Sequence, residues 1–535
     1  MDLKDLFAKK FNIKKSPVFY PYIFAVFPIF FLFAHNIEEV FFPEVLMPSI
    51  FILSLTVLMK LCLRLMVKNT HKTGILISVF LIFFFTYGAA YDVVIGFRIK
   101  NLIIDSHKFF IFFWCACFIF AVHLIIRIKW NLRILTNFLN IMSFVLFVLV
   151  LINISVYKLK TNDVKQIDLT FERTKNKDNN EKETISSSFS KDILRDIYYI
   201  ILDGYASSST LKEIYDFNNA EFEKHLISKG FYIATESRSN YVLTFLSLAS
   251  SLNMKYINFL TEMLGDKSKD RKIPYQMISN SEVMNFLKWN GYKFIHFSSG
   301  WGATNYNKFA DLNVYNSRAN EFWMILIRTT LLRLFENHFI VYVARKRVVS
   351  SFSQLGKINR IKEPKFVFAH IIPPHPPYIF GADCGPVSKT SLEMSGGVWE
   401  QKRNYLNQLI CINKKVEMLI ESILLQSSIS PIIIIQSDHG TASTFIDSDS
   451  GTASWGNPTE KMIRERTRIF NAYYLPDFNE DEEYIYDSIT PVNTFRCVLN
   501  YYFDTNYGLL EDFSYYSNYD YPYKFINVTG IAKYD

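Results

Sequence analysis

The chain has 535 residues, more than one ordinary domain holds, and half of them are hydrophobic while only 20% are charged. This composition is typical of a membrane segment joined to a soluble domain. The formal net charge is +8, but the basic residues flank apolar segments and form no aromatic-rich basic stretch, which argues against nucleic acid as a partner. We therefore expect at least two units of different character.

Five apolar segments near the N-terminus each approach the roughly 20 residues that a helix needs to cross a bilayer. They occupy residues 17–35, 44–67, 73–95, 109–127 and 134–157. Basic residues lie before the first segment, after the second, and between the fourth and fifth, whereas the loop after the first holds glutamates and no lysine or arginine. By the positive-inside rule, the N-terminus is cytoplasmic and everything after Tyr157 is extracytoplasmic.

The rest of the chain divides into a linker and a second domain. Residues 158–195 are polar and mixed in charge, which predicts a solvated linker. Strand-like runs then alternate with helix-like stretches, the pattern of an α/β domain with a largely parallel sheet flanked by helices. The predicted parts are a five-helix transmembrane domain over 1–157, the linker over 158–195 and an extracytoplasmic domain over 196–535.

Two further features concern the soluble part. An apolar insert with scattered arginines between Asn313 and Pro364 fits an amphipathic helix on the membrane surface that guides a lipid, or a helix packed on the sheet. We favour packing on the sheet. Cys384, Cys411 and Cys497 cannot all pair within one domain and include no Cys-x-x-Cys motif, so we expect buried or free thiols.

Three strand-like runs end in side chains suited to metal or phosphate chemistry. They are residues 197–202 before Asp203, residues 365–369 before His370 and His375, and residues 431–436 before Asp438 and His439. In open parallel sheets, ligands bind beyond the carboxyl ends of the strands, so these side chains should converge on one crevice. Two carboxylates, an imidazole and a hydroxyl suit Zn²⁺ or Mn²⁺, and the two negative charges require a cation.

Thr244 is the candidate hydroxyl nucleophile. It opens a Ser-rich stretch that predicts the start of a helix, where backbone N–H groups and the helix dipole favour a phosphoryl oxygen. An alternative is that Thr244 is an N-cap, with Ser247, Ser250 and Ser251 as small packing residues. The segment taken alone favours this alternative.

Four segments together resemble the signatures of the alkaline-phosphatase and sulfatase superfamily, in the order that this superfamily uses. They are LDGYA, SNYVLTFLSLAS, HIIPPHPPY and SDHG, within residues 196–503. Five spans followed by such a domain resemble lipoteichoic acid synthases and lipid A phosphoethanolamine transferases. Thr244 stands in no sulfatase-type C/S-x-P-x-R motif, and no histidine follows His439, unlike in the phosphoethanolamine transferases. The missing C/S-x-P-x-R motif disfavours sulfate-ester hydrolysis, and the missing histidine is a departure from the phosphoethanolamine transferases in particular.

The resemblance implies one divalent metal, zinc or manganese. Its ligands would be Asp203, Thr244, Asp438 and His439. Thr244 would attack phosphorus and hold a covalent intermediate. His375 would contact the phosphoryl group or the leaving oxygen, with the substrate-binding His370 behind it. Trp301 would form a wall for the headgroup, and an aromatic side chain packed in the core is the alternative for it.

The resulting hypothesis is a metal-dependent transferase in a bacterial inner membrane, with its catalytic domain in the periplasmic or extracellular space. It would move a headgroup, phosphoglycerol or phosphoethanolamine, from a membrane phospholipid to a cell-envelope glycan or lipid. A membrane-anchored phosphodiesterase or phosphatase is the first alternative. A non-catalytic membrane scaffold is the second.

Overall fold

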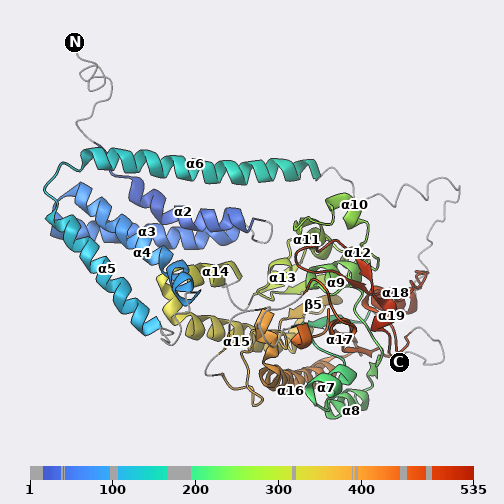
Figure 1. The fold of residues 1–535 in the computed structure, drawn as a ribbon. Coiled ribbons are helices and arrows are strands. Elements are labelled where there is room, and N and C mark those ends of the chain that lie inside the picture. The colour runs from blue at the N-terminus through green and yellow to red at the C-terminus, as the bar shows by residue number, and fades with distance from the viewer. Residues whose placement is uncertain are drawn as a thin grey trace. The chain divides into compact units, whose positions relative to one another are not determined.

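A computed structural model gives the fold (Figure 1). It describes residues 16–534 apart from 38–39, 41, 97–106, 165–193, 316–320, 388–389, 392–393, 395, 446–454 and 478–484. The chain separates into two compact units. The helical unit comprises Met1–Ser186 and Phe322–Glu336, and the α/β unit comprises Ser187–Glu321 and Asn337–Asp535. Most of the predicted linker lies outside the described residues.

The helical unit contains the apolar segments as helices. They are α2 (Tyr20–His35), α3 (Pro43–Val67), α4 (Thr70–Gly96), α5 (His107–Arg127) and α6 (Arg133–Val164). Within the described residues, α3 to α6 provide four stretches long and apolar enough to cross a membrane, and α2 is apolar but has 16 residues. The membrane character of the N-terminal part agrees with the sequence prediction, while a fifth span remains a prediction.

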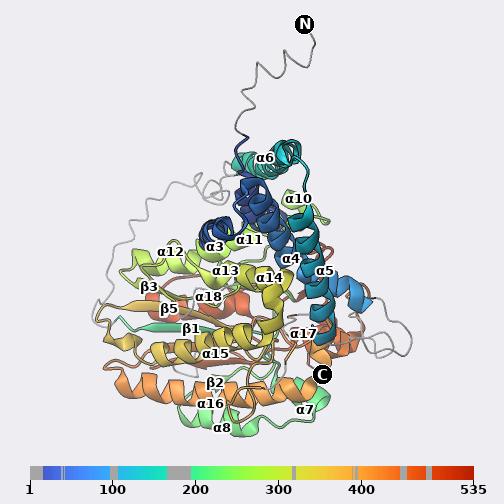
Figure 2. The same cartoon turned by 90° about the vertical axis from the view of Figure 1, so that its left-hand side faces the viewer.

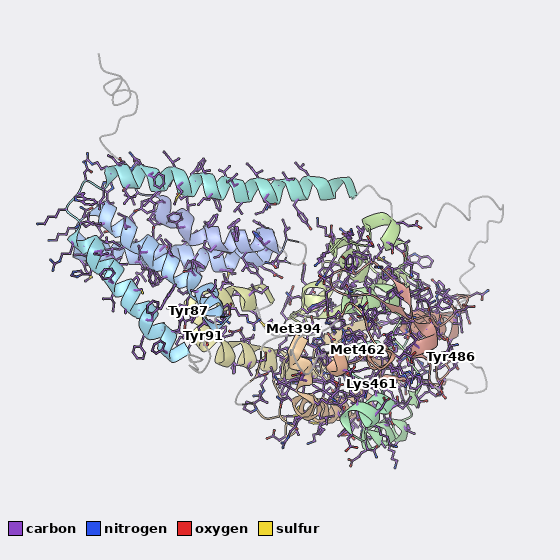
Figure 3. All side chains as sticks on the ribbon, in the orientation of Figure 1. Tyr87, Tyr91, Met394, Lys461, Met462 and Tyr486 are labelled. Atoms are coloured by element: carbon purple, nitrogen blue, oxygen red, sulfur yellow. A yellow bond between two sulfur atoms is a disulfide. The ribbon has the colours of Figure 1, made fainter. Side chains whose placement is uncertain are left out.

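Part of the insert belongs to this helical unit. Its first elements are α14 (Glu321–Thr329) and the 3₁₀ helix η1 (Leu331–Phe335). Phe322 and Leu326 are buried in one apolar cluster with residues of α2, α3 and α4. Leu331 and Leu334 pack against a second cluster around Tyr87 and Tyr91 of α4, two residues labelled in Figure 3.

Polar contacts hold the same segment to α4. Arg333 donates from Nη1 to the carbonyl oxygen of Gly88 at 3.0 Å, and its Nη2 lies 2.7 Å from Asp92 Oδ1. The favoured prediction, packing on the sheet, is therefore wrong for α14 and η1, because their apolar side chains are buried among the N-terminal helices. It holds for the end of α15 (Glu336–Leu355), whose residues Val348, Phe352 and Leu355 enter the α/β core.

The α/β unit is built on a seven-stranded sheet. Its strands are β1 (Ile197–Leu202), β2 (Tyr232–Ile233), β3 (Lys293–Phe297), β4 (Leu312–Val314), β5 (Lys365–Ile371), β6 (Ile432–Gln436) and β7 (Asn471–Tyr474). The order across the sheet is β2-β7-β6-β1-β5-β3-β4. The five strands from β6 to β4 run parallel, and β7 is antiparallel to β6 and β2. A largely parallel sheet was predicted.

Helices cover both faces of this sheet. Figure 2 shows α12 (Glu282–Trp289) on one side and α15 and α16 (Lys402–Gln426) on the other. All six residues of β1 are buried, which explains why its sequence IYYIIL is continuously apolar. The remaining elements are α7 (Ser208–Tyr215), α8 (Ala220–Ser228), α9 (Thr244–Ser251), α10 (Leu260–Leu264), α11 (Lys272–Ser279), α13 (Gly302–Asn305), η2 (Ile358–Arg360), η3 (Gly396–Glu400), η4 (Ser443–Phe445), α17 (Glu460–Thr467), α18 (Pro491–Phe503), β8 (Tyr515–Tyr516), β9 (Ile526–Asn527) and α19 (Thr529–Ala532).

The cysteines of the α/β unit include one disulfide. Cys384, in the loop after β5, is bonded to Cys411 of α16, and Cys497 is a buried free thiol. The expectation of buried or free thiols is therefore wrong for Cys384 and Cys411. Sequence spacing could not reveal this pair, because a tertiary contact brings the loop against the helix.

Candidate metal centre

The candidate site lies at the carboxyl ends of three adjacent parallel strands. Strand β1 lies between β5 and β6, and Ile201 is in register with both His370 and Gln436. Asp203 directly follows β1, His370 is the penultimate residue of β5, and Asp438 is the second residue after β6. Because the strands are parallel and end at the same level, their terminal side chains meet.

His439 stands at the centre of the polar contacts. Its Nε2 lies 3.3 Å from Asp438 Oδ2, 3.5 Å from Asp203 Oδ1 and 3.0 Å from Thr244 Oγ1. Its Nδ1 lies 2.9 Å from the carbonyl oxygen of Gly440, which can only accept a hydrogen bond, so this nitrogen carries the proton. The neutral ring therefore presents the lone pair of Nε2 to the two carboxylates, as a metal ligand does.

The two carboxylates are buried close together. No hydrogen bond from any described residue reaches Asp203 Oδ1 or Asp438 Oδ2. Burial raises the pKa of Asp203, and burial followed by the charge of Asp203 raises the pKa of Asp438. Two such groups require a shared proton or a cation. With the His439 nitrogen and the Thr244 hydroxyl, they fit a hard or borderline divalent ion.

Two glycines of the recognised motifs let the backbone enter this site. Gly204 has a φ of +66°, a conformation that favours glycine, and donates its backbone N–H to Asp438 Oδ1 at 3.2 Å. A Cβ on Gly440 would lie 2.0 Å from the carbonyl oxygen of Glu465. The close packing of both loops thus explains the glycines of LDG and DHG.

Thr244 is the first residue of α9, and its side chain is not the helix cap. The N-cap is Leu243, which makes no side-chain capping bond. Thr244 is partly exposed, whereas the seven following residues of α9 are all buried. Ser247, one of these, donates to the Asp438 carbonyl oxygen at 2.8 Å. The predicted helix start therefore agrees with the structure, and Thr244 is the one residue of α9 that is not buried.

The other histidines and Trp301 surround the central group. His370 has a side chain that is 0% exposed, with Nε2 3.2 Å from Asp203 Oδ2 and Nδ1 2.8 Å from Thr304 Oγ1. It can orient Asp203 but offers no open face to a substrate. Trp301 contacts the edge of the His370 ring with 5.7 Å between centroids, and it is partly exposed.

His375 packs against two other rings of the site. Its ring is 4.9 Å from that of Trp399 and 5.9 Å from that of His439. Its Nδ1 is 2.8 Å from the Pro376 carbonyl oxygen and therefore carries a proton, which leaves Nε2 as an acceptor. One potential ligand atom from each of Asp203, His375 and His439 lies within 4.8 Å of the other two.

Sequence reasoning missed one residue of the site, Arg466. Its Nε donates to the Val242 carbonyl oxygen at 3.0 Å and its Nη1 to that of Gly440 at 2.9 Å. It thereby connects the loop before Thr244 to the loop after His439. Burial and then the charge of Arg466 lower the pKa of His439. Nothing in the segment RERTR distinguishes this buried arginine from its neighbours.

Comparison with known proteins found similar solved structures at low sequence identity. No protein-family model and no curated protein matches the sequence. The fold is similar to the zinc complex of the C-terminal periplasmic domain of EcEptC from Escherichia coli, with TM-score 0.43, 13% identity and coverage of 63% of this chain and 94% of that chain. It is also similar to the C-terminal periplasmic domain of phosphoethanolamine transferase EptC from Campylobacter jejuni, with TM-score 0.36, 12% identity and coverage of 58% and 90%. A third similar structure is the integral membrane protein lipooligosaccharide phosphoethanolamine transferase A from Neisseria meningitidis. Its TM-score is 0.36 and its sequence identity is 11%, and the match covers 89% of this chain and 93% of that chain. These similar structures include one of the classes that the sequence motifs resemble.

Proposed function

We propose that the chain is a membrane-anchored, metal-dependent transferase. It moves a phospholipid-derived headgroup, phosphoglycerol or phosphoethanolamine, to a cell-envelope glycan or lipid through a covalent intermediate on Thr244. The observation that carries this proposal is the hydroxyl of the partly exposed Thr244, which lies 3.0 Å from His439 Nε2, next to two buried carboxylates. A purely structural threonine has no need of such surroundings.

The residues present fit a divalent cation, zinc or manganese. Asp203, Thr244, Asp438 and His439 would hold it. When bound there, such a cation would lower the pKa of the Thr244 hydroxyl and neutralise charge that develops during displacement at phosphorus. The buried carboxylate oxygens without a hydrogen-bonding partner among the described residues support this assignment. His370 acts here as a positioning residue that holds Asp203 through Nε2.

The chain's own residues account for the group transfer. In the first step, a bond forms between Thr244 Oγ1 and phosphorus as the bond from phosphorus to the diacylglycerol oxygen breaks. In the second, an acceptor hydroxyl oxygen bonds to phosphorus and the Thr244 bond breaks. The proton that Thr244 loses ends on the leaving oxygen, which His375 would contact through Nε2 because its Nδ1 is engaged by Pro376. In the second step, the proton of the acceptor hydroxyl ends on Thr244 Oγ1.

Membrane attachment supports a lipid donor. Four helices capable of crossing a bilayer precede the α/β unit and would confine the reaction to the membrane that contains the phospholipid. The disulfide between Cys384 and Cys411 supports an oxidising, extracytoplasmic location for this unit. The charge pattern of the sequence predicts the same side.

The test uses the full chain in vesicles that contain headgroup-labelled phosphatidylglycerol or phosphatidylethanolamine. We expect the label on Thr244 by peptide mass spectrometry, and then on an added envelope acceptor. Thr244→Ala should abolish both signals, and Ser250→Ala, which removes a buried hydroxyl of the same helix, should keep them. Release of free headgroup phosphate alone would indicate a phosphodiesterase. A protein that binds no metal and acquires no label would be a scaffold.

A further inference from the structure

The transfer scheme above assigns no role to the buried guanidinium of Arg466. Arg466 lies at the end of α17 and is 1% exposed. Two of its nitrogens are bound by the neutral carbonyl groups of Val242 and Gly440. Its third nitrogen, Nη2, is buried, and none of the described residues forms a hydrogen bond with it.

No carboxylate of the described residues forms a hydrogen bond or an ion pair with the Arg466 guanidinium. The adjacent carboxylate of Glu465 is occupied, because hydroxyl and backbone N–H groups of Thr441, Ser443 and Thr444 donate to its two oxygens. The ring of Trp455, 5.3 Å from the guanidinium, offers only a weak cation–π contact. A buried cation without a directly bonded anion is costly, so binding of an anion that accepts from Nη2 is favoured.

The position of Arg466 identifies where that anion would bind. Val242 is two residues before Thr244, and Gly440 directly follows His439. The positive charge of Arg466 interacts electrostatically with Asp203, His375 and His439. The other arginines after His439 for which the structure shows partners donate to carbonyl groups elsewhere: Arg464 to Ile531, Arg468 to Ala532 and Lys533, and Arg496 to Met254 and Gly508.

We propose that Arg466 binds the transferred phosphoryl group, with Nη2 donating to one of its oxygens. This inference rests on the proposed function and extends it. Nε and Nη1 fix the planar guanidinium, so little reorganisation is needed when the anion enters. Arg466 is a cationic side chain that the segment downstream of His439 brings against Val242 and Gly440.

The experiment measures binding of inorganic phosphate to the full-length zinc-loaded protein by titration calorimetry. Arg466→Met should weaken binding by roughly 10- to 150-fold, the loss expected for a hydrogen bond to a charged group. Arg466→Lys keeps the charge but cannot reproduce the three-nitrogen geometry, so an intermediate loss is expected. Arg468→Met is the matched control, because Arg468 is also buried and donates to the carbonyl oxygens of Ala532 and Lys533 in the C-terminal segment, so phosphate affinity should not change.

Zinc content and thermal unfolding are measured for each variant. Wild-type phosphate affinity in Arg466→Met with zinc retained would overturn the inference. Parallel loss of zinc and phosphate would also overturn it and would indicate that Arg466 only braces the two loops. If Arg466→Met does not fold, Arg466→Lys decides by the same criteria. If phosphate binding depends on Arg466 but Thr244 acquires no label, the proposed function alone is rejected. If Thr244 is labelled but Arg466→Met binds phosphate as well as the wild type does, this inference alone is rejected.

Discussion

Replacing Asp438 by asparagine tests whether a cation compensates the two buried carboxylates. Ligand atoms of Asp203 and Asp438 lie within 4.8 Å of each other. Two unit charges at that separation repel by about 3.5 kcal/mol when the effective dielectric constant is 20. Without metal, Asp438→Asn removes this repulsion, and its side-chain oxygen can still accept from Gly204. We therefore expect the metal-free variant to be more stable than the metal-free wild type.

Metal should reverse that order. A ligand present at 1,000 times its dissociation constant stabilises the folded protein by about 4 kcal/mol. The wild type should gain this stabilisation, and Asp438→Asn, which has lost a charged ligand, should gain much less. The advantage of the metal-free variant should also shrink as pH falls, because a raised folded-state pKa lets Asp438 take up a proton in the native protein.

The assay is thermal unfolding of the full-length protein at pH 8, in chelator and in excess zinc. Asp520→Asn is the control, because Asp520 is in an exposed ion pair with Lys269 and should leave both transitions unchanged. The reasoning would be refuted if the metal-free Asp438→Asn protein unfolded below the metal-free wild type. Equal stabilisation of both proteins by zinc would refute the ligand assignment.

Three further predictions concern the α/β unit. Glu465→Gln should lower the free energy of unfolding by about 2–3 kcal/mol, because a buried acceptor for several hydrogen bonds loses its charge; an unchanged denaturant midpoint would contradict this. Burial lowers the pKa of His296 to about 3, so stability should fall as pH drops from about 6.5 toward 3, at up to about 1.4 kcal/mol per unit. His296→Asn should show a shallower acid slope, and identical slopes would assign the effect to other groups. Replacing Cys384 and Cys411 by serine should cost about 3–4 kcal/mol, the entropy of closing a loop with a sequence separation of 27; equal chemical denaturation curves would exclude such a contribution.

The sequence was sufficient to predict the elements whose burial is uniform. β1 covers the predicted residues 197–202, because a strand buried on both faces is a continuous apolar run. The side chains after β1, β5 and β6 also meet, since parallel strands place their carboxyl ends together. The start of α9 at Thr244 was predicted as well, although the orientation of its hydroxyl required the neighbouring loop of His439.

What the sequence could not predict depends on tertiary partners. Arg466 is one of several arginines in a charged segment, and only the fold shows that Val242 and Gly440 surround it. The pairing of Cys384 with Cys411 depends on a loop meeting a helix. The apolar pattern of α14 is compatible with several surfaces, and helix periodicity does not specify which one it covers.

The excursion of residues Phe322–Glu336 into the helical unit affects how the α/β unit can be produced separately. A fragment starting at Ser187 would carry this segment without the helices that shield Phe322 and Leu326 from water. Such a fragment should self-associate through apolar side chains that are buried in the intact protein. Replacing residues Phe322–Glu336 by a short glycine-serine linker should give a monodisperse α/β fragment suitable for crystallisation.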